Sequence, residues 1–78
     1  MIKKQIFHLW RIDDSESYDL KVIAGGSAAE LIQIKEQLAG RLFRIHEYSD
    51  HITAVFTGEW LDCTNKIWQL KAEGWKWK

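Results

Sequence analysis

Two stretches of this chain carry nearly the same apolar pattern, and that repetition limits the folds open to it. Residues 8–12 read HLWRI and residues 41–45 read RLFRI, so leucine, arginine and isoleucine recur and Trp10 falls opposite Phe43. Similar patterns are expected to fold alike. We therefore predict two strand–strand–helix units fused in a single domain, which cover residues 1–39 and 40–78.

The first half has the signals of a hairpin followed by a helix. Residues 4–13 alternate as a strand does, with Ile6, Trp10 and Ile12 on one side and Phe7, Leu9 and Arg11 on the other. The polar run at 13–17 predicts a turn, and residues 18–24 resume the alternation. Ser27 and Glu30 have the spacing of a capping box, so a helix is expected from Ala28, with Gly40 as its left-handed cap.

The second half repeats these signals. Phe43 and Ile45 take the inward positions of a third strand, residues 49–51 form a turn, and Ile52, Ala54 and Phe56 face inward on a fourth strand. The spacing of Trp60, Cys63, Ile67 and Leu70 predicts a second helix that stops at Gly74. The alternative is a further hairpin, in which residues 66–71 turn into the alternating tail 75–78. With the helix, that tail is expected to be a short edge strand.

These elements predict an α+β fold with an antiparallel four- to five-stranded sheet and both helices packed on one face. The other face would then be uncovered. The strand phase places an apolar and basic set of side chains there: Leu9, Arg11, Ile23, Leu42, Arg44, His46, Tyr48, Thr53 and Val55. A surface of this kind is more than a monomer usually exposes, which makes it a candidate interface.

Composition narrows the classes of partner and compartment. The formal net charge is zero, which argues against a protein that holds duplex DNA through many phosphate contacts. Zero charge with five tryptophans favours self-association, so a homodimer is one expectation. Cys63 is the only cysteine, and a cytoplasmic location is the default for a chain without an internal disulfide. His8 and Arg11 break the N-terminal apolar run, so we expect neither a signal peptide nor a membrane span.

Few residues suggest chemistry. The run from His46 to His51 holds two imidazoles and two carboxylates, a set that can in principle bind zinc or transfer a proton. Neighbouring strand residues point to opposite sides, however, so a solvated hairpin end is the better interpretation. Cys63 on an apolar helix face is expected to be a small buried side chain rather than a nucleophile. No phosphate-binding glycine loop is present. We expect no enzyme, no metal site and no cofactor.

Tryptophans are the remaining signal. Trp10 and Trp60 fall in inward positions and are expected in the core, whereas Trp68, Trp75 and Trp77 are harder to bury in so small a domain. The alternation of tryptophan and lysine over residues 75–78 allows three interpretations. It could cover the sheet edge, anchor a protein interface, or bind single-stranded nucleic acid through rings and ammonium groups.

The strand–strand–helix–strand–strand order over residues 5–56 resembles small phage-encoded inhibitors of bacterial defence, of the anti-CRISPR type. The resemblance lies in architecture alone, without a shared motif, and no residue role carries over. It implies stoichiometric binding to a protein or nucleic-acid site without turnover.

We therefore predict a non-enzymatic protein-binding module, a small inhibitor or adaptor that acts by blocking a surface. The residues expected to bind the partner are Arg11, Arg44, His46, Tyr48, Trp75 and Trp77. The alternative is a protein that binds single-stranded nucleic acid through Arg44, Tyr48, Trp75, Lys76, Trp77 and Lys78.

Overall fold

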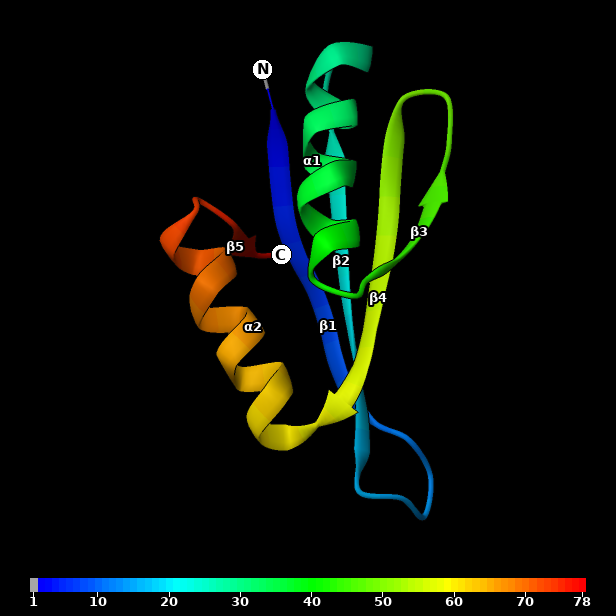
Figure 1. The fold of residues 1–78 in the computed structure, drawn as a ribbon, viewed down its shortest axis with the longest axis vertical. Helices are drawn as coiled ribbons and strands as arrows, with labels where there is room; N and C mark the ends of the chain where they lie inside the picture. Colours follow the sequence, from blue (N-terminus) through cyan, green and yellow to red (C-terminus); the bar gives the residue numbers. More distant parts are fainter. Residues whose placement is uncertain (1) are drawn as a thin grey trace.

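The computed structural model describes residues 2–78 as an α+β fold, in agreement with the predicted fold class. Five strands and two helices follow one another along the chain (Figure 1): β1 (Lys3–Arg11), β2 (Ser17–Gly25), α1 (Ala28–Gly40), β3 (Arg44–Glu47), β4 (His51–Glu59), α2 (Trp60–Ala72) and β5 (Lys76–Trp77). Residues 66–71 belong to α2, so the alternative hairpin is wrong. No helix among residues 2–78 combines the length and apolar character needed to cross a membrane.

The sheet is mixed rather than antiparallel, which corrects the prediction. Its strand order is β3-β4-β2-β1-β5, and every neighbouring pair is antiparallel except β1 and β5. The reason lies in the crossover. Helix α2 carries the chain from β4 across the sheet to the far edge beyond β1, and a helical crossover of this kind joins strands that run in the same direction. Strand β5 therefore runs in the direction of β4. It is also parallel to β1, because β1 and β4 are both antiparallel to β2.

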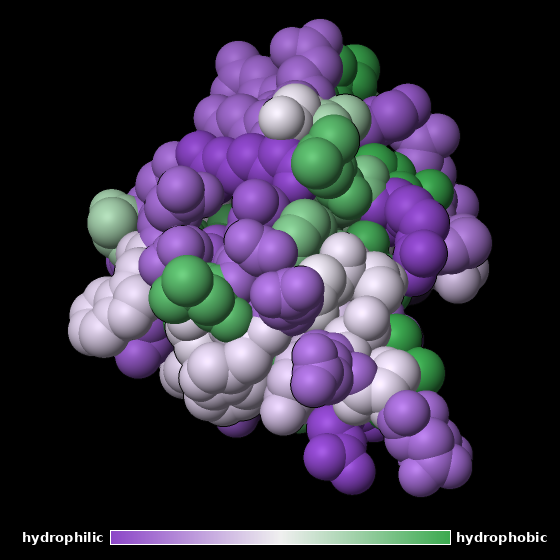
Figure 2. Space-filling view, turned by 60° about the horizontal axis from the view of Figure 1, so that its bottom comes forward, coloured by the Kyte–Doolittle hydropathy of each residue, from purple (hydrophilic) through white to green (hydrophobic). Residues whose placement is uncertain are grey.

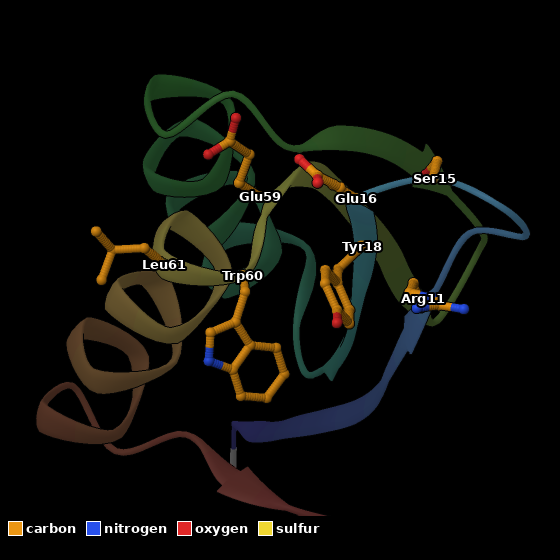
Figure 3. A pocket seen from close by; sticks show the side chains of 7 residues that line it. All are labelled: Arg11, Ser15, Glu16, Tyr18, Glu59, Trp60 and Leu61. Carbon is orange, nitrogen blue, oxygen red and sulfur yellow. The ribbon is translucent and has the colours of Figure 1, made fainter.

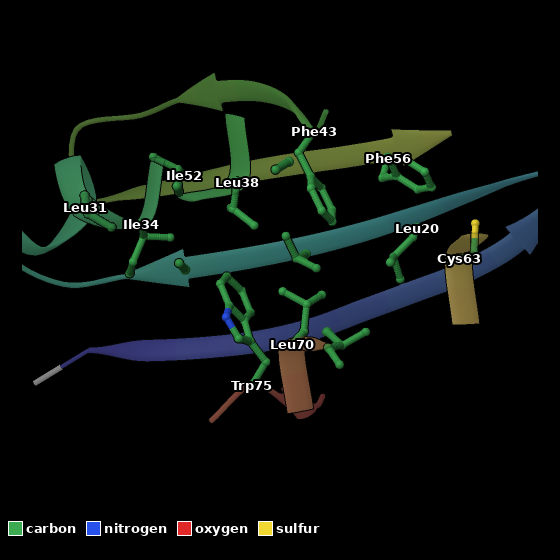
Figure 4. Close-up of a cluster of buried hydrophobic side chains, with 14 residues drawn as sticks. Leu20, Leu31, Ile34, Leu38, Phe43, Ile52, Phe56, Cys63, Leu70 and Trp75 are labelled. Carbon is green, nitrogen blue, oxygen red and sulfur yellow. The ribbon is translucent and has the colours of Figure 1, made fainter. Parts of the chain in front are cut away.

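Both helices pack on the same face of the sheet (Figure 1). Side chains from α1, α2 and the inward positions of β2 and β4 form one buried cluster between the helices and the strands (Figure 4). Its members are Ile6, Leu20, Val22, Ala24, Leu31, Ile34, Leu38, Phe43, Ile52, Ala54, Phe56, Cys63, Leu70 and Trp75. This one cluster joins both helices to the sheet. We call the opposite side of the sheet, which neither helix covers, the open face.

Helix α1 begins where the capping box predicted. The Ser27 hydroxyl accepts a hydrogen bond from the Glu30 amide at 3.3 Å, and the Glu30 carboxylate accepts one from the Ser27 amide at 2.9 Å. Hydrogen bonding of the carboxylate to Ser27, first of all to its backbone amide, holds the pKa of Glu30 below its ordinary value, because it stabilises the charged form.

The end of α1 differs from the prediction. Gly40 is still helical, and the left-handed residue is Leu42, with a φ of +68°. The exit of α2 has the same geometry at Gly74, where φ is +95°. After each turn the chain returns to the helix: the Phe43 amide bonds to the Leu38 carbonyl at 3.1 Å, and the Trp75 amide bonds to the Leu70 carbonyl at 3.0 Å.

A β-bulge in β1 changes which side chains reach the open face. Ile6 pairs with Val22, but the next pair joins His8 to Lys21, so Phe7 is the extra residue. One extra residue reverses the alternation that follows it. Leu9 consequently pairs with buried Leu20 and packs against the core, and Trp10 turns outward.

The bulge overturns two expectations. Leu9 and Arg11 are not on the open face, and Trp10 is not a core residue: its side chain is 37 % exposed, whereas Phe43 is buried at 5 %. Trp10 and Phe43 therefore do not occupy matching places, so this part of the predicted alignment between the two halves is wrong.

Candidate interaction surfaces

The open face carries the outward side chains of all five strands. Strand register places Lys21 beside Val55 and Ile23 beside Thr53 in the middle of the sheet, at the junction of β2 and β4. Arg44 and His46 lie on the same face of β3, next to Val55 and Thr53, as the sequence predicted. At the opposite edge, Lys76 of β5 pairs with Gln5 of β1.

An aromatic cluster lies on the β1 side of this face. Phe7, His8, Trp10 and Lys21 line a shallow hollow of about 450 Å³. The rings of His8 and Trp10 meet edge to face at 4.7 Å. The Phe7 ring has the ammonium groups of Lys78 and Lys21 above it, at 4.3 and 5.4 Å. The hollow thus combines aromatic surface with positive charge.

The residues predicted to bind a partner do not form one site. Arg44, His46, Lys76 and Lys78 reach the open face, but Trp75 is a core residue, 3 % exposed. The remaining three are separated from one another: Arg11 lies at the far end of β1, Tyr48 in the β3–β4 turn, and Trp77 beside Ile6 at the sheet edge. A buried tryptophan cannot contact a partner, so the place of Trp75 differs from the one predicted.

The polar turn that follows β3 is a solvated hairpin end. The Tyr48 ring stacks on His51 at 4.5 Å, and His51 Nδ1 lies 2.7 Å from the Asp50 carboxylate, a hydrogen bond that lowers the pKa of Asp50. Within residues 2–78, no three or more histidine, cysteine, aspartate or glutamate side chains are placed to share a metal ion. Cys63 is fully buried, and burial raises the pKa of its thiol.

A second surface was missed by the sequence interpretation: the outer side of α2. Trp60, Leu61 and Trp68 are 55, 68 and 71 % exposed. Leu61 and Trp68 are seven residues apart and therefore share one side of the helix, opposite the buried pair Cys63 and Leu70. Figure 2 shows hydrophobic and near-neutral residues gathered at the end of the molecule where α2 begins. The spacing of Leu61 and Trp68 was a readable sign of a second apolar stripe.

A groove continues this surface toward the β1–β2 turn (Figure 3). It has a volume of about 380 Å³ and is lined by Arg11, Ser15, Glu16, Tyr18, Glu59, Trp60 and Leu61. The Tyr18 and Trp60 rings form its aromatic centre, edge to face at 5.1 Å with an angle of 61°. Charged side chains from the turn and from β4 surround this centre, an arrangement common in protein interfaces.

The chain matches no protein-family model, and neither the curated proteins nor the solved structures contain a match to it.

Proposed function

We propose that the chain is a non-enzymatic protein-binding module whose partner docks on the outer side of α2. The observation that carries this proposal is the exposure of Leu61 and Trp68 on one side of the helix, with Trp60 also exposed at the first turn, beside the groove. A packed tryptophan buries about 150–250 Å². Covering the 71 % of Trp68 that is exposed would therefore contribute about 3–4 kcal/mol at about 25 cal/mol per Å². That is the magnitude of an interface hot spot.

The groove beside α2 would extend this contact and orient it. Its Tyr18–Trp60 pair forms an aromatic floor, and Arg11, Glu16 and Glu59 provide a charged rim. Aromatic centres with charged rims are typical of specific interfaces, in which the rim fixes orientation and the centre supplies affinity. A small inhibitor or adaptor that blocks a partner's surface, as the resemblance to anti-CRISPR proteins implies, is one form of such a module.

Comparison of the two helices supports a specialised role for α2. We infer that α1 and α2 are counterparts in two related strand–strand–helix units, because their first residues are 32 positions apart and their exits make the same hydrogen bonds. At this spacing, the positions of Trp60, Leu61 and Trp68 correspond to Ala28, Ala29 and Glu36. At these three positions α1 is thus small or polar where α2 carries tryptophan or leucine, although Ile32 of α1 is also 58 % exposed. Sheet packing alone does not require the α2 side chains.

Site-specific photo-crosslinking in cells of the native host tests the proposal. A benzoylphenylalanine placed at position 68 or 61 is expected to capture one and the same protein, and the corresponding α1 position, Glu36, serves as the matched control. The captured protein, once purified, should bind the wild-type chain at least about 10-fold more tightly than Trp68→Ser, because the exposed tryptophan supplies several kcal/mol.

Three results would distinguish the outcomes. A crosslinked species of twice the 9.2 kDa chain mass would identify the partner as a second copy. Equal capture at positions 36 and 68, or an affinity unaffected by Trp68→Ser, would overturn the proposal. Glu36→Ser should leave the affinity unchanged.

A further inference from the structure

The charges of this chain are balanced in number but separated in space. Lysine and arginine total 11, as do aspartate and glutamate. Strand register and ring contacts place five of the cations on the open face: Lys3, Lys21, Arg44, Lys76 and Lys78. Many carboxylates lie elsewhere, as with Glu47 and Glu73, which pair with Lys35 and Arg41. A neutral chain can therefore present a positive surface.

Few carboxylates lie on the open face, and the one nearest its middle, Asp19, is hydrogen-bonded within the protein. Asp19 accepts a hydrogen bond from the Thr57 hydroxyl at 2.6 Å, and that hydroxyl accepts one from Arg44 at 3.1 Å. Asp50 lies at one corner of the sheet, where it bonds to His51. Glu59, at the opposite end of β4, lines the groove beside α2. Asp19 keeps its charge beside Trp10, but it is outnumbered on the β1–β5 side of the open face, where Lys3, Lys21, Lys76 and Lys78 lie.

The aromatic hollow adds a second kind of contact. The bulge places Phe7 and His8 on the same side of β1, with Trp10 nearby, so three rings gather where regular alternation would have placed fewer. Every nucleobase has a flat face that stacks on such rings, and the strength of stacking depends little on sequence. The ammonium groups of Lys21 and Lys78 lie over the Phe7 ring, at 5.4 and 4.3 Å, where they can meet phosphates that flank a base stacked on His8 or Trp10.

The geometry points to single-stranded nucleic acid as the ligand of the open face, with bases on His8 and Trp10 and phosphates on the cations around them, including the two over Phe7. Neighbouring strands are about 4.8 Å apart, so the five strands span about 19 Å between β3 and β5. That width suits a short segment of about four nucleotides, at the lower end of known site sizes. A duplex keeps its bases stacked within the helix, where the rings of the hollow cannot reach their faces.

This activity is independent of the proposed protein interface. The outer side of α2 belongs to the helical side of the molecule, whereas the aromatic hollow lies on the open face (Figure 1). Either surface can be altered without touching the other, so failure of one proposal leaves the other standing.

Fluorescence anisotropy of a labelled 12-nucleotide oligothymidylate, titrated with the full chain at several salt concentrations, tests the inference. Three or four phosphate contacts predict a slope of log K against log salt of about −2 to −3. Lys78→Gln should weaken binding and make the slope shallower by about 0.7. Trp10→Leu should weaken binding about 5- to 100-fold and leave the slope unchanged, because stacking is lost without loss of charge.

Matched variants on α2 complete the design. Lys71→Gln removes a cation beside Trp68, and Trp68→Ser removes an exposed indole; both should bind oligothymidylate as the wild type does. Circular dichroism checks the fold of Trp10→Leu, and the combined Lys76→Gln and Lys78→Gln variant tests the same face through exposed side chains alone.

Three results would overturn the inference. These are no binding at low salt, binding that Trp10→Leu and the lysine variants leave intact, and displacement of the oligonucleotide by polyglutamate as readily as by unlabelled oligothymidylate. The last result would assign the face to an acidic protein.

Discussion

Leu42 gives the sharpest test of the fold, because it occupies a backbone conformation suited to glycine. Its φ is +68° and its side chain is 77 % exposed. The left-handed conformation costs a residue with a Cβ about 1–2 kcal/mol. Glycine avoids that cost but loses about 0.4–1 kcal/mol through the greater entropy of the unfolded chain. We therefore expect Leu42→Gly to raise the free energy of unfolding by about 0.5–1 kcal/mol, since so exposed a side chain contributes little burial.

Gly74 provides the reciprocal experiment at the exit of α2. Its φ is +95°, and an added Cβ would meet only the Lys4 side chain, at 3.7 Å or more, which is ordinary contact. Gly74→Ala should lower the free energy of unfolding by a similar amount, about 0.5–1 kcal/mol, with no steric contribution. The double variant should return close to the wild type. Leu42→Ala, which keeps the strain, should change stability by less than about 0.5 kcal/mol.

Urea unfolding followed by circular dichroism measures each of these free energies. The reasoning fails if Leu42→Gly is neutral or destabilising while its m-value equals that of the wild type. It also fails if Leu42→Ala costs as much as Gly74→Ala, because the Leu42 side chain would then be stabilising the fold through contacts.

Three further predictions concern the ion pair, the cap and the thiol. The Arg41 guanidinium, bound through both nitrogens, holds the pKa of Glu73 below its ordinary value. The stabilisation by this ion pair is fully present above the unfolded pKa of Glu73 and disappears as the pH falls through the lowered folded pKa. Glu73→Gln should therefore lower the free energy of unfolding by about 0.2–1 kcal/mol at pH 7. Thermal melts should show this difference vanish in acid, whereas the control Glu36→Gln should show no such pH dependence. Ser27→Ala should cost about 1 kcal/mol in the same melts. Cys63, whose thiol pKa is raised by burial, should react with Ellman's reagent at least about 1,000-fold more slowly in the native protein than in denaturant.

Local signals explain which parts of the fold could be predicted. The capping box of Ser27 and Glu30, the stop at Gly74 and the polar turns all depend on residues a few positions apart, so they act before tertiary structure forms. The prediction that Gly40 is the left-handed cap also depended on a local signal, and it was wrong. Glycine there allows a left-handed cap, but the return of Phe43 to the core sets the turn two residues later, at Leu42.

The strand pairing depends on residues far apart in sequence, and no local pattern indicates the bulge in β1 or the parallel pairing of β5. The bulge at Phe7 adds one residue to β1, and an alternating pattern reads the same whether or not a residue is inserted in the pairing. This single event moved Leu9 and Trp10 to the sides opposite those expected. The parallel pairing of β5 depends on where α2 delivers the chain, which no residue within β5 specifies.

Helical geometry explains the tryptophans. Trp60 shares the three-four spacing of Cys63 and Leu70 only approximately, because at 100° per residue it lies well to the side of the buried direction. At the first residue of α2 it therefore turns to solvent, 55 % exposed. Trp75, three residues before Lys78, is buried in the core instead, because the turn after α2 returns its amide to the Leu70 carbonyl.

The burial of Trp75 gives the protein a built-in optical reporter. Trp10, Trp60, Trp68 and Trp77 all keep contact with water, whereas Trp75 is 3 % exposed. A variant with phenylalanine at the four exposed positions would have Trp75 as its single tryptophan. A blue shift of its fluorescence emission would mark the burial of Trp75 beneath α2. Strand β5 pairs with β1 although the paired residues lie at opposite ends of the sequence. Contacts between residues so far apart in sequence form slowly. That emission would therefore report when the C-terminal segment packs into the core.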